Sequence, residues 1–212
     1  MKGCRPLTDA EVEIIRRSFR GINAKRTAAL FIVGVKTGFR ISELLSLRIS
    51  DLIFQGKAVD LLTVHKRYMK GGKDGEDKKA VAESRTVPLH PDAHPEILEQ
   101  WRDLMESQGR YHPDTYFFQS RQQGNISIDR IQAWRDLTAV YRACGLSGRI
   151  ATHGMRKTFA RIKLEFLKEQ WHPGEEIPIQ ELRDIMGHQD IRSTQEYVKF
   201  ANTKYTAAFL QS

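Results

Sequence analysis

Two short stretches pair a basic side chain with a partner three residues away, a spacing that places both on one face of a helix. Arg40 is followed by Glu43, and His153 is followed by Arg156. A guanidinium group can hold an anion through two parallel hydrogen bonds, and an imidazole can donate to it or transfer a proton. Each pair taken alone is more typical of an ordinary ion pair or helix surface.

Further candidates lie in two other parts of the chain. His188 follows a glycine, and Tyr197 stands nine residues after it. Residues 66–83 contain six Lys and Arg side chains against four acidic ones. Taken singly, these features are typical of a helix end, a packed tyrosine and a solvated hairpin tip. The order arginine, lysine, HxxR, histidine and tyrosine along one chain is far rarer by chance than any single member.

The elements that must position these residues are mostly helical. Thr8 and Glu11 have the spacing of a capping box, which predicts a helix start. Apolar periodicity predicts further helices over about residues 26–36, 41–47, 95–108, 128–144, 152–168 and 179–186. Ser127 is the expected cap of the helix that begins at residue 128. Residues 59–64 and 84–89 are expected to be strands on either side of segment 66–83. The fold class predicted is mainly α with a small antiparallel β-sheet.

Composition limits the function classes. The 212 residues include 34 Lys and Arg against 26 Asp and Glu, a formal net charge of +8, which favours a polyanionic partner. The two cysteines offer neither a disulfide framework nor metal-ligand spacing. No apolar run approaches the roughly 20 residues that span a bilayer, and the N-terminus lacks a signal peptide's apolar core. We therefore expect a cytoplasmic protein with no membrane contact.

Together these stretches resemble the catalytic domain of tyrosine recombinases, the phage integrase family. The matching runs are TGFRISEL at 37–44, SRTVPL at 84–89, HGMR at 153–156 and MGH at 186–188 with the tyrosine at 197. The resemblance spans about residues 7–200 and implies the tyrosine recombinase/integrase catalytic-domain fold. We expect one catalytic domain over residues 1–212, with a tail at 201–212 and no N-terminal core-binding domain.

The resemblance implies site-specific DNA cleavage and rejoining, with Tyr197 as the nucleophile that forms a 3′-phosphotyrosyl link. Arg40 and Arg156 would clamp the scissile phosphate, because fixed guanidinium donors stabilise charge that develops on its oxygens. His188 would donate to the same phosphate, and His153 would donate to it or transfer a proton.

The resemblance also implies an acidic residue that supports the arginines, here Glu43, and a hairpin lysine that protonates the leaving 5′-oxygen. Lys70 best matches the family's Lys-Gly turn, and Lys66, Lys73 and Lys79 remain open. No cofactor or metal is expected. The implied partner is double-stranded DNA, bound by a homo-tetramer during synapsis.

Some features depart from the family pattern or leave alternatives open. The interval from Arg156 to His188 is longer than usual, and Met155 stands where a leucine is more common. The tail could dock on a neighbouring copy or pack on its own domain. The alternatives are a type IB topoisomerase-like DNA relaxing enzyme and a non-catalytic DNA-binding protein of the same fold. Other basic residues, such as Arg130, Arg135 and Arg149, are further candidates for phosphate contacts.

Overall fold

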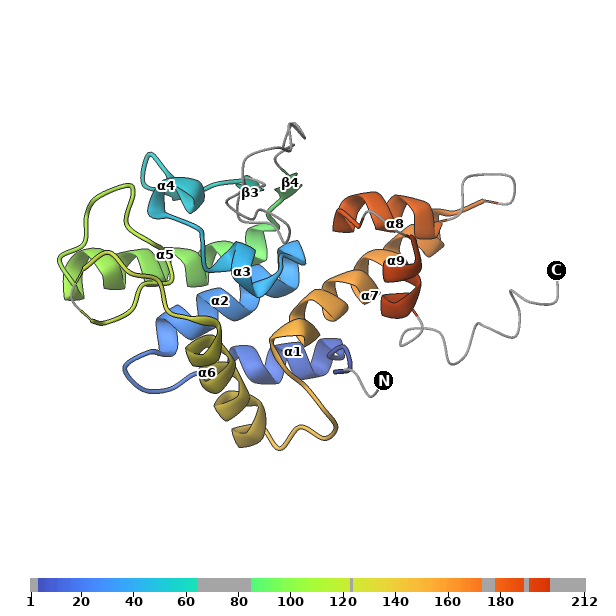
Figure 1. The fold of residues 1–212 in the computed structure, drawn as a ribbon, viewed down its shortest axis with the longest axis horizontal. Coiled ribbons are helices and arrows are strands. Elements are labelled where there is room, and N and C mark those ends of the chain that lie inside the picture. The colour runs from blue at the N-terminus through green and yellow to red at the C-terminus, as the bar shows by residue number, and fades with distance from the viewer. Residues whose placement is uncertain (1–3, 65–84, 123, 173–177, 189–190, 199–212) are drawn as a thin grey trace, which may run out of the picture.

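Helices make up most of the chain (Figure 1). The computed structural model describes residues 4–64, 85–122, 124–172, 178–188 and 191–198, without the side chains of residues 178 and 196–198. The helices are α1 (Asp9–Arg16), α2 (Ala24–Thr37), α3 (Ile41–Leu44), α4 (Ile49–Leu52), α5 (His94–Arg102), α6 (Arg130–Ala143), α7 (Thr152–Gln170), α8 (Pro178–Met186) and α9 (Ile191–Val198), with a 3₁₀ turn η2 (Pro91–Ala93) and a π turn η3 (Asp103–Ser107).

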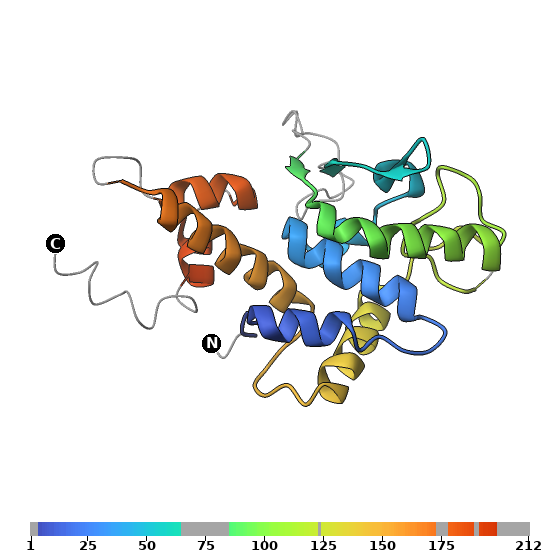
Figure 2. The same cartoon turned by 180° about the vertical axis from the view of Figure 1, so that it is seen from behind.

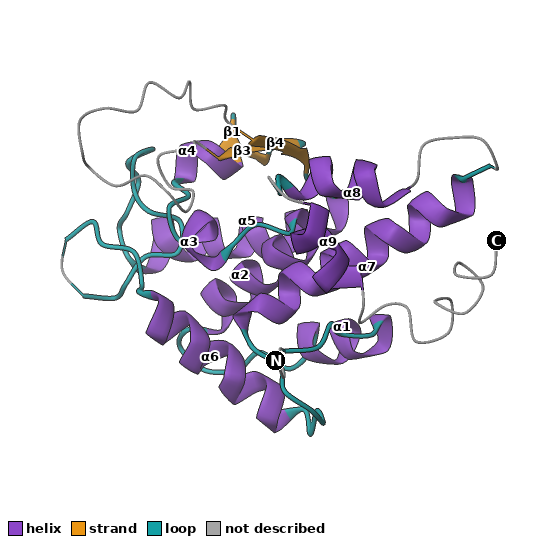
Figure 3. Cartoon of the chain, turned by 45° about the vertical axis from the view of Figure 1, so that its right-hand side comes forward, coloured by secondary structure: helices purple, strands orange, loops and turns teal. Residues whose placement is uncertain are grey.

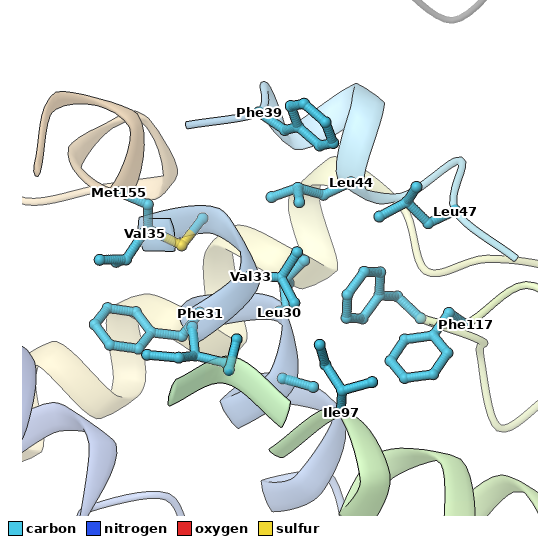
Figure 4. Packing of buried hydrophobic residues seen from close by; sticks show 14 of the residues in the cluster. Leu30, Phe31, Val33, Val35, Phe39, Leu44, Leu47, Ile97, Phe117 and Met155 are labelled. Atoms are coloured by element: carbon cyan, nitrogen blue, oxygen red, sulfur yellow. The ribbon is translucent and has the colours of Figure 1, made fainter. Parts of the chain in front are cut away.

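Helix α2 runs through the main hydrophobic core. Its middle is buried on every side, as expected for a helix that is apolar all round. Figure 4 shows Leu30 of α2 near Ile97 of α5 and Phe117, while Met155 of α7 lies beside Val35. Each of these five side chains is at most 1% exposed, and full burial of such a side chain stabilises the fold by about 1.5–3 kcal/mol.

The strands form two short antiparallel pairs (Figure 3). Strand β3 (Leu61–Val64) pairs with β4 (Arg85–Pro88), with Leu61 opposite Pro88 and Val64 opposite Arg85. Strands β1 (Ile53–Phe54) and β2 (Lys57–Ala58) form the second pair. Because side chains alternate along a strand, Arg85 lies on the same face of β4 as the buried Val87.

A second cluster holds the C-terminal helices together. Phe159 and Leu164 of α7 pack with Leu182 and Met186 of α8. Seen from either side, α7 extends away from the main body with α8 and α9 against it, and the C-terminal end of α8 faces the α2–α3 junction and β4 (Figures 1 and 2). The active-site candidates meet at that end.

Most of the predicted elements are confirmed, and the capping box of α1 is present with both of its hydrogen bonds. The cap predicted for α6 is wrong: Asp129 accepts from the N–H of Gln132, while the hydroxyl of Ser127 donates to the carbonyl of Phe118. Neither the β1–β2 pair nor α9 was expected from the sequence. Among the described residues no helix is long and apolar enough to cross a membrane.

Candidate active site

The site begins at a buried carboxylate. Glu43 in α3 is fully buried, and its carboxylate accepts from the backbone N–H of Arg40 at 2.6 Å and from Arg40 Nη1 at 2.9 Å. The predicted pairing of these two residues is therefore confirmed, but it is not a surface ion pair. The Arg40 side chain keeps 29% exposure, so Glu43 binds it from the protein interior while part of the side chain remains accessible to solvent.

A second arginine, from β4, reaches the same carboxylate. Arg85 Nη2 donates to Glu43 Oε2 at 3.2 Å, and the guanidinium carbon lies 4.5 Å from the centre of the Phe39 ring. Its Nη1 donates to the carbonyl oxygen of Met186, the last residue of α8, at 2.6 Å. Burial lowers the pKa of Arg85 to about 10, with Glu43 opposing the shift and Arg156 and Arg40 adding to it, so the group remains charged near neutrality.

Arg156 closes the group from α7. Its side chain is 1% exposed, its Nη2 donates to the same Met186 carbonyl at 2.7 Å, and its Nη1 donates to the carbonyl of Gly38. Gly38 stands two residues before Arg40. A closed circuit of contacts therefore links the α2–α3 junction, β4, α7 and the end of α8.

Two glycines in the left-handed backbone conformation lie at this circuit, one after α2 and one after α8. Gly38 ends α2 with φ +63°, and a Cβ there would lie 2.4 Å from the Phe159 ring. Gly187 follows α8 with φ +62°, and a Cβ there would lie 3.1 Å from Arg85 Cδ. Both positions favour glycine for its conformation and for the space available. They turn Arg40 and His188 towards the same region.

His188 lies buried beside this circuit. A hydrogen bond of 2.9 Å joins its Nδ1 to the hydroxyl of Thr194 in α9, and its backbone N–H donates to the carbonyl of Arg183. Burial, followed by the nearby charges of Arg156, Arg40 and Arg85, lowers the pKa of His188 to about 3. The imidazole is neutral at neutral pH, with Nδ1 occupied by Thr194.

His153 lies one turn before Arg156 in α7. Its pKa is lowered to about 4, first by the loss of water around the ring, although the residue as a whole stays exposed, and then by Arg156, Lys157 and Arg40. Arg156 and Arg40 lower the pKa of both histidines. The region they share is therefore strongly electropositive.

The remaining candidates are placed less fully. Tyr197 falls in the last turn of α9, the helix that also contributes Thr194, and its side chain lies outside the described part of the chain. The candidate lysines, Lys70 together with Lys66, Lys73 and Lys79, all lie outside the described residues, as does the tail at 201–212. Within the described ranges no cluster of three His, Cys, Asp or Glu side chains could hold a metal ion.

Sequence reasoning missed two residues of this group, Arg85 and Thr194. A signal for Arg85 was present: it stands two residues before Val87 in a predicted strand, so alternation places a charged side chain on the buried face. Thr194 had no such signal, because no helix was expected over the residues that form α9. Its role is visible only from the bond to His188.

The arrangement can bind an anion through several donors at once. Guanidinium groups and neutral imidazoles donate to oxygen, and the positive potential around them favours a phosphate or a similar group. Donors fixed by buried contacts need no rearrangement as charge develops on the bound group, which is the condition for strong electrostatic stabilisation of a transition state.

Known proteins resemble this chain over most of its length. The model of the phage integrase family matches residues 6–204. The probable integrase/recombinase YoeC of Bacillus subtilis is 28% identical over 185 residues, which cover 87% of this chain and 83% of YoeC. The tyrosine recombinase XerA of Pyrococcus furiosus is 29% identical over 175 residues, which cover 82% of this chain and 49% of XerA. The chain thus spans about half of that Xer recombinase.

Solved structures share the fold. The crystal structure of XerA recombinase matches with a TM-score of 0.66 and 20% identity, over 97% of this chain and 63% of that one. The catalytic domain of bacteriophage HP1 integrase matches with a TM-score of 0.53 and 16% identity, over 98% and 95% of the two chains. With the helical fold, the small antiparallel sheet and the family match over nearly its whole length, this chain belongs to the phage integrase family and has the fold of a tyrosine recombinase catalytic domain.

Proposed function

We propose that this chain is a site-specific DNA recombinase that cleaves and rejoins DNA strands through a phosphotyrosyl intermediate at Tyr197. The observation that supports this function best is the circuit of Arg40, Glu43, Arg85 and Arg156 beside a buried histidine. A DNA phosphodiester carries one negative charge and gains another in the pentacoordinate transition state. Fixed cationic donors are what such a reaction requires.

The proposed roles rest on the family resemblance, and the positions of the described side chains support them. Arg40 is half-buried, so it can offer its exposed donors to a phosphate oxygen while Glu43 holds the rest. Arg156 acts from α7 and His188 from the end of α8, and His153 donates to the phosphate or moves a proton. The oxygen of Tyr197 attacks phosphorus and gives its proton to a base, for which the neutral His153 is the candidate. The bond from phosphorus to the 5′-oxygen of the next nucleotide breaks, that oxygen takes a proton, and the reverse reaction rejoins the strand.

A hairpin lysine is the proposed source of that proton, with Lys70 preferred over Lys66, Lys73 and Lys79. Its sequence context, lysine followed by two glycines, is the basis of the preference. A lysine ammonium is a mobile point donor, which suits transfer to a leaving oxygen. Each of the four lysines is replaced singly by methionine, and cleavage is measured on a normal substrate and on one with a 5′-sulfur leaving group, which needs no acid. The donor is the lysine whose variant cleaves the normal substrate poorly but the sulfur substrate normally.

The proposed partner is double-stranded DNA, with four copies of the chain acting together at synapsis. Recombination of two duplexes breaks four strands, and one nucleophile per chain then requires four chains. The structures of XerH bound to difH DNA and of the Tn1549 transposon integrase bound to circular intermediate DNA are neighbours of this fold. We place the activity in the cytoplasm, the compartment that holds DNA in bacteria.

The test uses covalent capture. The chain is incubated with a pool of duplexes that carry a randomised segment and a nick placed so that the short cleaved fragment diffuses away. Wild-type protein is expected to become covalently linked to a selected set of sequences, while Tyr197→Phe forms no link. Tyr205→Phe is the matched control, since it removes another C-terminal tyrosine hydroxyl, and it is expected to link normally.

Absence of any covalent product with the wild-type chain, together with retained DNA binding, would support a non-catalytic DNA-binding protein instead. If adducts form, exchange between two duplexes that carry the captured sequence separates a recombinase from an enzyme that only relaxes supercoils. A relaxing enzyme would return each strand to its own duplex.

A further inference from the structure

We propose that Arg85 is a positioning residue that fixes Arg40 and His188 relative to one another for DNA cleavage, an inference that rests on the function proposed above. It comes from β4 and stands between the two halves of the site. Its guanidinium contacts both the carboxylate that holds Arg40 and the carbonyl that precedes Gly187 and His188. Arg85 therefore acts on Arg40 through Glu43 and on His188 through the Met186 carbonyl.

Arg85 first supports Glu43. Its Oε2 accepts from the backbone N–H of Arg40 and from Arg85 Nη2, while its Oε1 accepts from Arg40 Nη1. A carboxylate that is fully buried is stable in its charged form only when such donors surround it. Arg85 therefore holds the same Glu43 oxygen that accepts from the backbone of Arg40, and the other oxygen is left for the Arg40 guanidinium.

Arg85 also supports the end of α8. The carbonyl of Met186 accepts from Arg85 Nη1 at 2.6 Å and from Arg156 Nη2 at 2.7 Å, so both of its lone pairs are used. Cations are favoured at the C-terminal end of a helix, where the carbonyls carry partial negative charge. Gly187 then turns the chain with Arg85 Cδ against it, and His188 follows. The position of His188 is thus set from β4 as well as from α7.

The planar fork of an arginine is needed for this role. Arg85 donates from one terminal nitrogen to Glu43 and from the other to Met186, while its guanidinium carbon lies over the Phe39 ring. A lysine has one terminal nitrogen, so it can keep the positive charge but cannot reach both partners in this geometry. Arg85→Lys therefore separates the charge of the residue from its shape.

Arg26 provides a matched control. Its side chain is 7% exposed, against 10% for Arg85, and it also bridges a carboxylate and a backbone carbonyl, Asp136 at 2.8 Å and Gln119 at 3.0 Å. It lies at the opposite end of α2 from the site. Arg26→Lys removes the same type of bridge without touching any candidate site residue.

The experiment measures single-turnover cleavage and DNA affinity on a duplex captured by the wild-type chain, well below the melting temperature of each variant. Arg85→Lys is expected to slow cleavage by about tenfold to a hundredfold, as loss of alignment does, with the Kd for DNA within about twofold of wild type. Arg26→Lys is expected to lower the melting temperature and leave the cleavage rate within about twofold. Arg85→Gln is measured alongside and is expected to show the same loss of cleavage rate. It takes the place of the lysine variant if that variant fails to fold.

A cleavage rate for Arg85→Lys equal to that of Arg26→Lys would overturn the proposal, and so would a Kd that weakens in step with the rate, because that pattern belongs to a direct phosphate contact. Amide hydrogen exchange gives a readout without DNA. The N–H groups of Arg40, Gly187 and His188 are expected to exchange faster in Arg85→Lys but not in Arg26→Lys, and unchanged exchange contradicts the proposal. If the wild-type chain forms no adduct, the proposed function fails, while exchange still decides the positioning role.

Discussion

Glu43 is the single residue on which the local geometry depends most. It is fully buried and accepts three hydrogen bonds, from the backbone and side chain of Arg40 and from Arg85. Two of the donors are charged, so the cost of burying the carboxylate is offset only while both remain in place. Its spacing from Arg40 was visible in the sequence, but its burial and its second arginine were not.

Glu43→Gln tests this dependence. The amide keeps the shape but loses the charge and one acceptor, which leaves a donor at 2.6–3.2 Å without a matching oxygen. We expect a loss of about 1–3 kcal/mol in the free energy of unfolding, measured with urea. Glu13→Gln is the control, because the exposed Glu13–Arg17 pair is 3.8 Å apart and its loss should cost less than about 0.5 kcal/mol. Equal losses in the two variants would show that Glu43 is not bound as described.

His188 makes a prediction about pH. Its pKa is about 3 in the folded chain, whereas an unperturbed histidine has a pKa of 6.5. Below pH 6.5 the unfolded chain binds a proton that the folded chain does not, so the contribution of His188 to stability is full above pH 6.5 and is lost as the pH falls towards 3.

We therefore expect the free energy of unfolding to fall between pH 6.5 and 5, with His188 contributing up to about 1.4 kcal/mol per pH unit. His188→Gln should reduce this slope, as measured by urea unfolding at closely spaced pH values. His153 acts with the same sign and remains in both proteins. A slope that is identical in wild type and variant would mean that His188 titrates normally in the folded chain.

At the scale of elements, the α2–α3 junction determines where Arg40 lies. Gly38 has φ +63°, and a Cβ on it would lie 2.4 Å from the Phe159 ring of α7. Gly21 has φ +85°, but a Cβ on it would meet open space. The two glycines thus separate the cost of a left-handed backbone from the cost of a steric clash.

Gly38→Ala is expected to lower the free energy of unfolding by about 2–4 kcal/mol, since backbone strain adds to overpacking. Gly21→Ala should cost about 1–2 kcal/mol from backbone strain alone. Urea unfolding of both variants measures the difference. If Gly38→Ala costs no more than Gly21→Ala, then α7 does not approach the junction as closely as described.

Local signals explain which elements the sequence could predict. Thr8 and Glu11 form a capping box within four residues, and the predicted helix start is confirmed. Strands β1 and β2 have two residues each, too few for any periodicity, so their hairpin could not be seen. The α6 cap was assigned to Ser127, although Asp129 has the same capping chemistry and stands directly before the helix.

At the scale of the whole molecule, the site is assembled from contacts between distant parts of the chain. Arg85 meets Glu43 across 42 positions and Met186 across 101. Spacing within one helix predicted that Arg40 lies with Glu43 and His153 with Arg156, whereas the family resemblance brought these pairs together with His188. Neither source indicated that β4 joins the two halves, because that follows only from the packing of β4 against α8 and the α2–α3 junction.

Tyr197 is the proposed nucleophile, and peptide mapping of the captured adduct identifies the residue that carries the DNA. After digestion with nuclease and trypsin, residues 193–199 form one peptide in which Tyr197 is the only tyrosine. Mass spectrometry is expected to find a nucleotide remnant on Tyr197 of the wild-type chain and none in Tyr197→Phe. A remnant on any other residue would contradict the account, and so would an adduct that persists in Tyr197→Phe.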